Sequence, residues 1–106
     1  VHGSVHGPGY SAGNAVTKKY DLQNDRFDTD FHIFGIEWGE NYINYYVDDF
    51  LYNRITPADV SGEWVYNKPF FMLINMAVGG TFVGSPSPET VFPQTLEVDY
   101  IKIYEK

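Results

Sequence analysis

Two pairs of carboxylates have a spacing that would place both side chains on one face of a strand. They are Glu97 with Asp99 and Asp28 with Asp30, each pair separated by one residue. Such a pair could serve as acid and base in glycoside hydrolysis, which needs two carboxyl groups roughly 5–9.5 Å apart. Asp28 and Asp30 fall in a polar connector, and no third carboxylate follows Glu97 and Asp99 to complete a cluster. We therefore interpret both pairs as structural.

Metal-binding patterns in the sequence are incomplete. The segment 21–32 begins with the ligand spacing of a calcium loop, but Arg26 stands where the loop requires Gly and His32 where it requires Glu. His2 and His6 would share a strand face, although no known zinc motif has this spacing. The chain has no cysteine, which excludes disulfides and thiolate metal sites. The residues alone therefore leave zinc as a minor alternative.

Composition narrows the class of ligand. Fourteen acidic residues against seven basic ones give a net charge of −7, which repels nucleic acid and anionic lipid surfaces. No apolar run approaches the ~18 residues of a membrane span. Aromatic residues make up 18% of the chain, and their rings can stack on sugar C–H faces while carboxylates and amides bind the hydroxyls. The sequence thus indicates a carbohydrate ligand, with no nucleic acid and no membrane as partner.

The elements that would position these residues are predicted to be short strands. Three aromatic and β-branched runs over 31–55, separated by turn residues, predict a β-meander whose first strand packs on both sides. A strand end near Val5 leads into a Gly-rich loop, and 21–30 and 56–68 are connectors. Further strands are predicted over 69–80 and 96–105. With no helical stripe, the fold class is an all-β antiparallel sandwich (jelly roll), with 1–106 as a single unit.

Four blocks of sequence resemble the laminarinase-like members of family 16 glycoside hydrolases, in that family's order. They are SVHGPGYS, FHIFGIEWGENYINYYVDD, PFFMLINMAVGG and FPQTLEVDYIKIY, and they run from one end of the chain to the other. The resemblance covers only the C-terminal part of the family's jelly-roll catalytic domain. It implies an endo-β-1,3-glucanase.

The resemblance also implies that the catalytic residues lie outside this chain. The family's Glu-x-Asp-x-x-Glu strand, with a nucleophile and an acid/base, precedes the HGPGYS block and has no match here. The resemblance does imply supporting roles for three residues of this chain. It implies His6 as a histidine near the catalytic carboxylates, Asn75 as a cleft amide that binds substrate hydroxyls, and Trp38 as an aromatic residue of the cleft or core. Phe82 occupies a position where the family often has a stacking Trp.

Asp99 matches an aspartate that helps to hold a structural calcium in the family. Calcium takes six to eight oxygen ligands, so one aspartate cannot hold it tightly, and we expect calcium to be weakly bound or absent.

The resemblance implies hydrolysis of internal β-1,3 bonds of laminarin-type glucans by a retaining mechanism, outside the cell because the substrate is a polymer. The fragment alone is expected to be inactive. One alternative is a non-catalytic carbohydrate-binding sandwich. Another is a jelly-roll fragment that assembles with its missing N-terminal half or with a second copy of itself, because cutting the fold would leave strand edges open.

Overall fold

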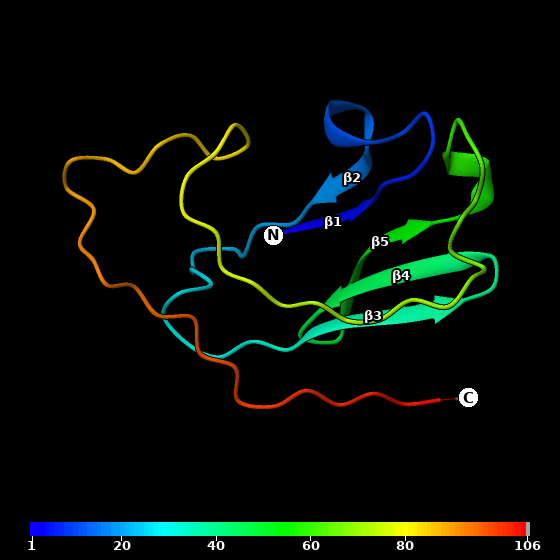
Figure 1. Cartoon of the computed structure of the whole chain (residues 1–106). Coiled ribbons are helices and arrows are strands. Elements are labelled where there is room, and N and C mark those ends of the chain that lie inside the picture. Colours follow the sequence, from blue (N-terminus) through cyan, green and yellow to red (C-terminus); the bar gives the residue numbers. More distant parts are fainter. Residues whose placement is uncertain (106) are drawn as a thin grey trace. The chain divides into compact units, whose positions relative to one another are not determined.

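The computed structural model describes residues 1–105 and contains five strands, all paired antiparallel. They are β1 (His2–Val5), β2 (Val16–Lys19), β3 (Phe34–Gly39), β4 (Tyr42–Val47) and β5 (Phe50–Ile55), with short 3-10 helices η1 (Ala12–Asn14) and η2 (Pro57–Asp59). No α-helix occurs among these 105 residues, which agrees with the predicted all-β fold class. The chain divides into two units, Val1–Phe70 and the residues from Phe71 onward, and all five strands belong to the first (Figure 1).

The predicted meander is confirmed as the three-stranded sheet β3-β4-β5. Two-residue turns join its strands, and in the turn between β4 and β5 Asp48 and Asp49 have φ of +49° and +66°. Positive φ at both central residues gives a turn whose twist matches that of the strands it joins, and Asp tolerates it better than most residues. A register shift between Tyr45 and Tyr46 interrupts the pairing of β4 with β5.

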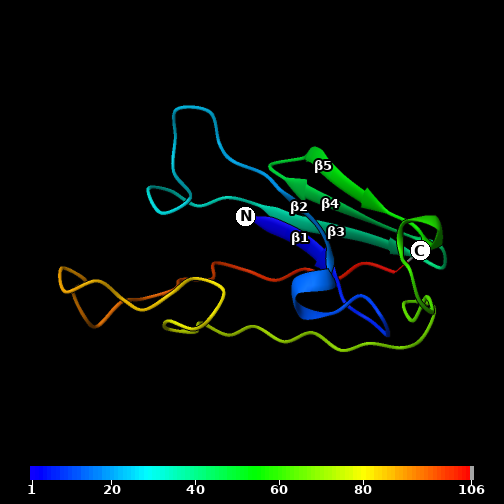
Figure 2. The same ribbon diagram turned by 90° about the horizontal axis from the view of Figure 1, so that it is seen from above.

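A second sheet, the hairpin β1-β2, covers part of the meander; Figure 2 shows both sheets from above. β1 passes so close to the tyrosines of β4 and β5 that a Cβ on Gly3 would lie 2.7 Å from the Tyr45 ring and 2.9 Å from the Tyr52 hydroxyl. The Tyr45 hydroxyl donates to the Ser4 carbonyl at 2.8 Å. Between the sheets lies a small core, made of Val5, Tyr10, Ile43, Tyr45, Val47, Tyr52 and Ile55.

The prediction that the first strand of the meander packs on both sides is wrong. This strand, β3, is an edge strand, and its apolar residues are uncovered. Phe34, Ile36 and Trp38 pair with the buried Val47, Tyr45 and Ile43 of β4 and so share the core-facing side. They are nevertheless 57%, 67% and 45% exposed. The β1-β2 hairpin therefore stops short of β3. We call these three residues the open strip.

From Phe71 on, the predicted strands over 69–80 and 96–105 are absent from the described residues, and the ribbon from yellow to red carries no arrow (Figure 1). The apolar side chains of Met72, Ile74 and Met76 are exposed. Alternation shows that a segment suits a pleated strand, but a strand also needs a neighbour to take its backbone hydrogen bonds. None of the pairings described for this chain involves these segments.

Candidate functional site

The loop after β1 carries His6 and is held by the distant segment 61–66. Gly7 and Tyr10 exchange backbone hydrogen bonds of 3.0 and 3.1 Å, which close the loop on itself. The buried Tyr10 hydroxyl donates to the Glu63 carbonyl at 2.6 Å. Burial, and secondarily the neighbouring Tyr66, raise the pKa of Tyr10, so its hydroxyl stays protonated and remains a donor.

The loop and the segment are also in close backbone contact. The Ser61 hydroxyl donates to the Gly9 carbonyl at 3.3 Å. A Cβ on Gly62 would lie 1.7 Å from the Pro8 carbonyl oxygen, so only glycine fits at this position. We call the contacts between 6–10 and 61–66 the clasp.

Tyr66 brings two of the predicted site residues together. Its hydroxyl accepts a hydrogen bond from the His6 backbone N–H at 2.9 Å and donates to the His6 carbonyl at 2.8 Å. Its own carbonyl accepts the indole N–H of Trp38 at 2.6 Å. His6 and Trp38, 32 positions apart in the sequence, are therefore fixed relative to each other through one residue.

Aromatic rings surround this junction. Phe70 stacks on Tyr66 with ring centroids 5.2 Å apart and meets Trp38 edge-on at 5.8 Å. Trp64 contacts Tyr66 edge-on at 5.4 Å and donates its indole N–H to the Glu40 carbonyl at 2.9 Å. These contacts restrict the orientation of the rings, because aromatic pairs prefer stacked or edge-to-face arrangements.

Beside the cluster lies an open depression of about 340 Å³. Its lining combines the aromatic side chains of Trp38 and Tyr66 with the polar residues Glu40, Asn67 and Lys68. Aromatic faces with amide, carboxylate and ammonium groups at the rim are the groups that bind the C–H face and the hydroxyls of a sugar ring. We take this depression, with His6 at the adjoining loop, as the candidate site.

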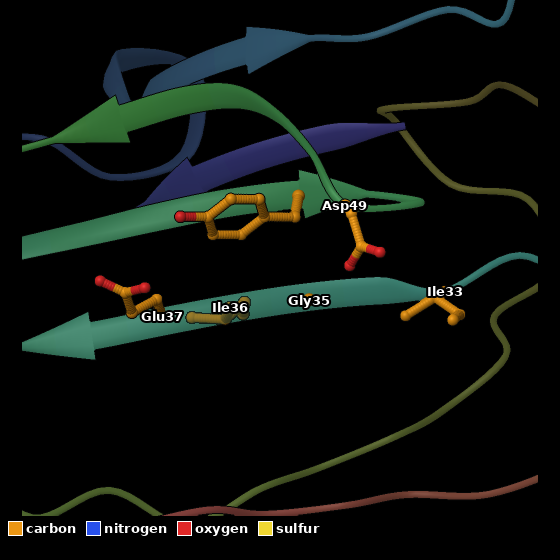
Figure 3. Close-up of a pocket in the computed structure, with 6 residues that line it drawn as sticks. Ile33, Gly35, Ile36, Glu37 and Asp49 are labelled. Atoms are coloured by element: carbon orange, nitrogen blue, oxygen red, sulfur yellow. The ribbon is translucent and has the colours of Figure 1, made fainter. Parts of the chain in front are cut away.

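A second depression, of about 210 Å³, lies on the opposite face of the meander. Figure 3 shows Glu37 at one end and Asp49 near the other, with Gly35 between them. Glu37 accepts a hydrogen bond from the buried Asn44 at 3.5 Å, and Asn44 in turn accepts one from Arg54 at 3.1 Å. The Glu37 carboxylate thus belongs to a network that satisfies the buried amide of Asn44, which is a structural role.

Three predicted site residues lie in the C-terminal unit. Asn75 and Asp99 are exposed and belong to no strand, and Phe82 is an exposed residue of a turn. The strand predicted over 69–80, which would have positioned Asn75, is absent from the described residues. Their assignment to substrate or metal stays a prediction.

The described residues do not form a calcium site by themselves. No three His, Asp or Glu side chains among residues 1–105 come together as metal ligands. Asp99 supplies one carboxylate where calcium takes six to eight oxygens. Calcium therefore stays a prediction for the longer fold that the resemblance implies.

No helix within residues 1–105 has the length and apolarity needed to cross a membrane.

Tyr66 and Phe70, which hold the candidate site together, are not among the site residues predicted from the sequence. Tyr66 lies in the predicted connector 56–68, and Phe70 in the predicted strand 69–80. The signal that was available is the density of aromatic residues in 64–71, which includes Trp64, Tyr66, Phe70 and Phe71. Trp64 and Tyr66 fall in the predicted connector 56–68, where large rings are expected only if they pack against another group or bind a ligand.

Comparison with known proteins places this geometry in a family. Residues 1–102 match the family model of glycosyl hydrolases family 16. The chain is 35% identical to a β-glucanase of Rhodothermus marinus, over 98% of the chain and 39% of that protein. Its structure resembles the endo-β-1,3-glucanase of Pyrococcus furiosus (TM-score 0.82, 44% identity, 87% of this chain and 37% of that one).

It equally resembles the laminarinase catalytic domain of Thermotoga maritima, with a TM-score of 0.80 and 43% identity over 86% of this chain and 38% of that one. The chain thus spans less than two fifths of the length of each of these proteins. The match across nearly all of its residues and the likeness of its antiparallel sheets agree: the chain belongs to family 16 of the glycosyl hydrolases.

Proposed function

We propose that this chain is the glucan-contacting part of a retaining endo-β-1,3-glucanase. The family match supports the hydrolase class, and the endo-β-1,3-glucanase and laminarinase among its structural relatives support the linkage. The observation that carries the proposal is the depression beside Trp38 and Tyr66, next to the loop with His6. In this proposal Trp38 stacks on a glucose ring, and His6 binds hydroxyls or supports the catalytic carboxylates.

The carboxylates that would perform the reaction are proposed to lie outside these residues. A retaining enzyme holds a nucleophile and an acid/base about 5–5.5 Å apart. The family's Glu-x-Asp-x-x-Glu pattern has one near match here, Glu97-Val98-Asp99, but Lys102 stands where the second Glu is required. An ammonium cannot act as the carboxylic acid that protonates the leaving oxygen, so the chain alone is expected not to hydrolyse glucan.

A partner polypeptide is part of the proposal. The open strip and the exposed apolar residues after Phe71 are surfaces that a folded protein normally covers. We propose that the remainder of the family's fold covers them, with a second copy of this chain as the alternative. Since laminarin-type glucans are polymers too large to enter a cell, we also propose that the protein works outside it.

The test is an assay of the purified chain with laminarin, in which released reducing sugar, bound laminarin and the mass of the protein in solution are measured on one sample. We expect no sugar release, and retarded migration in a native gel that contains laminarin. Trp38→Ala should abolish the retardation, because it removes the stacking ring. Phe31→Ala, a change at an aromatic residue that is 61% exposed and does not line the depression, is the matched control.

Other outcomes would redirect the proposal. Sugar release at an enzymatic rate would show a catalytic pair within the chain, and Glu97→Gln and Asp99→Asn would then be the first variants to assay. Absence of retardation would show that the depression does not bind this glucan. A folded monomer at micromolar concentration would argue against both the missing segment and the second copy as obligatory partners.

A further inference from the structure

The backbone of His6 is tied at two points by one side chain. Both its N–H and its C=O are hydrogen-bonded to the hydroxyl of Tyr66, at 2.9 and 2.8 Å. The turn that follows closes through Gly7 and Tyr10, so its own backbone bonds do not include His6. The peptide groups of His6 therefore take their orientation from Tyr66.

The other contacts of the clasp act on later positions of the loop. Ser61 holds Gly9, Gly62 lies against Pro8, and Glu63 accepts from Tyr10. Removing the Tyr66 hydroxyl would thus leave the body of the loop in place and release its first residue. This separation makes the contribution of Tyr66 measurable apart from the folding of the loop.

Tyr66 is itself held rigidly. Its ring is stacked on Phe70 with an interplanar angle of 15°, and its carbonyl holds the Trp38 indole. One residue thus orients both the peptide groups of His6 and the indole ring of Trp38. A side chain with its torsions locked by packing can hold a binding group in place at little entropic cost when ligand arrives.

We propose that Tyr66 is a positioning residue for glucan binding: its hydroxyl fixes His6 and its carbonyl fixes Trp38, so that both meet one glucan chain. This inference rests on the function proposed above. It adds Tyr66 as a residue that acts on the glucan through His6 and Trp38. The effect on His6 depends on the Tyr66 hydroxyl, since a phenylalanine ring at this position would stack on Phe70 equally well. Glucan binding should therefore depend on the Tyr66 hydroxyl, although this group bonds to the His6 backbone and not to the glucan.

The experiment compares Tyr66→Phe with Tyr104→Phe, which removes the hydroxyl of a highly exposed tyrosine of the C-terminal unit. The probe is a β-1,3-linked hexamer of glucose, and its affinity is measured by titration calorimetry. Loss of the two hydrogen bonds to His6 should weaken binding about tenfold in Tyr66→Phe, and Tyr104→Phe should bind as the wild type does.

A spectroscopic signature separates positioning from general destabilisation. In Tyr66→Phe the His6 backbone amide should shift in the NMR spectrum and exchange faster with solvent, because its acceptor is gone. The Trp38 indole N–H should keep its shift, because the Tyr66 carbonyl that accepts it is still present. Loss of both signals together would indicate an unfolded site and overturn the assignment of a separate role to the hydroxyl.

The failures of the two proposals are distinguishable. A wild-type chain that does not bind the hexamer overturns the proposed function and this inference with it. If Trp38→Ala loses binding while folded Tyr66→Phe keeps it, the function stands and the inference falls.

The wild type supplies a measurement that depends on no variant. The His6 amide and the Trp38 indole should shift with one common dissociation constant during titration with the hexamer. A shift of Trp38 alone would overturn the inference.

Discussion

The imidazole of His32 and the carboxylate of Asp48 meet where the segment between the connector 21–30 and β3 reaches the turn between β4 and β5. His32 donates from Nδ1 to Oδ2 of Asp48 at 2.6 Å, while Oδ1 of Asp48 accepts the backbone N–H of Ile33 at 2.9 Å. The Ile33 carbonyl accepts the Asp48 N–H at 2.8 Å. The His32 side chain is only 10% exposed, with Phe27 packed edge-on at 5.4 Å. One aspartate thereby joins the connector to a turn that its own left-handed backbone helps to form.

The pair makes stability depend on pH in a defined window. The hydrogen bond to Asp48, with the negative charges of Asp48, Asp25 and Asp30, raises the pKa of His32, although its burial opposes this. The stabilisation from His32 is therefore fully present below its ordinary pKa of about 6.5 and is lost as pH rises through the raised value. The hydrogen bonds from His32 and Ile33 lower the pKa of Asp48, so its contribution is present above about 3.9 and is lost as pH falls through the lowered value.

We expect the urea midpoint of unfolding of the wild type to fall as the pH rises above about 6.5, and this fall to be reduced in His32→Gln and Asp48→Asn. Asp28→Asn, at an exposed aspartate paired with Arg26, should retain the wild-type slope. Equal slopes in wild type and His32→Gln would contradict the assignment of the titration to this pair.

Gly62→Ala should destabilise the chain by about 1–3 kcal/mol, the usual cost of forcing atoms into a filled space. The added Cβ would lie 1.7 Å from the Pro8 carbonyl, which is backbone and cannot rotate away. Gly13→Ala is the matched control, because no atom lies within 4 Å of a Cβ built there. The measurement is urea unfolding of both variants, and equal stability of the two would show that the clasp is looser than the structure has it.

Ile55→Ala should cost about 2–5 kcal/mol, since Ile55 is almost fully buried in the core between the sheets. The same substitution at Ile36, in the open strip, should cost less than about 1 kcal/mol, because that side chain has little contact to lose. Urea unfolding at several protein concentrations checks both. A large cost at Ile36 that grows with concentration would show that another molecule covers the strip.

Amide hydrogen exchange should distinguish the two units. Amides of β4, paired on both edges, are expected to be the most protected, and those from Phe71 onward to exchange nearly as in an unfolded chain. The backbone bonds described there are short-range, such as Gly84 N–H to the Gly80 carbonyl at 2.7 Å. Protection over 69–80 comparable to that of β4 would mean that the strand predicted from the sequence forms in solution after all.

Local pattern was enough to predict the meander. The runs ending at Trp38, Val47 and Ile55 are rich in aromatic and β-branched residues and are separated by turn residues, so strand, turn and strand specify one another within a few positions. The strand β2 escaped prediction because Val16–Lys19 has a single apolar residue and two lysines. Its place is set by β1, which hydrogen-bonds to it, and pairing partners are not encoded in a four-residue pattern.

Long-range contacts account for the rest. The apolar run from Phe70 to Val78 has the composition of a buried strand, but burial requires a second surface that the sequence of the run cannot specify. The link from Tyr66 to His6 spans 60 positions and depends on how two loops fold back on each other. The candidate residues His6 and Trp38 were named from a family pattern, whereas the side chain that joins them had no such marker.

The clasp is expected to form late in folding. Each hairpin of the meander joins neighbours in sequence, so its loops close early and at small entropic cost, whereas the clasp joins residues 52 to 60 positions apart. It can close only after the meander has brought η2 and the residues behind it alongside the first loop. The candidate site beside the clasp is thus expected to be the last part of the N-terminal unit to assemble and the first to open.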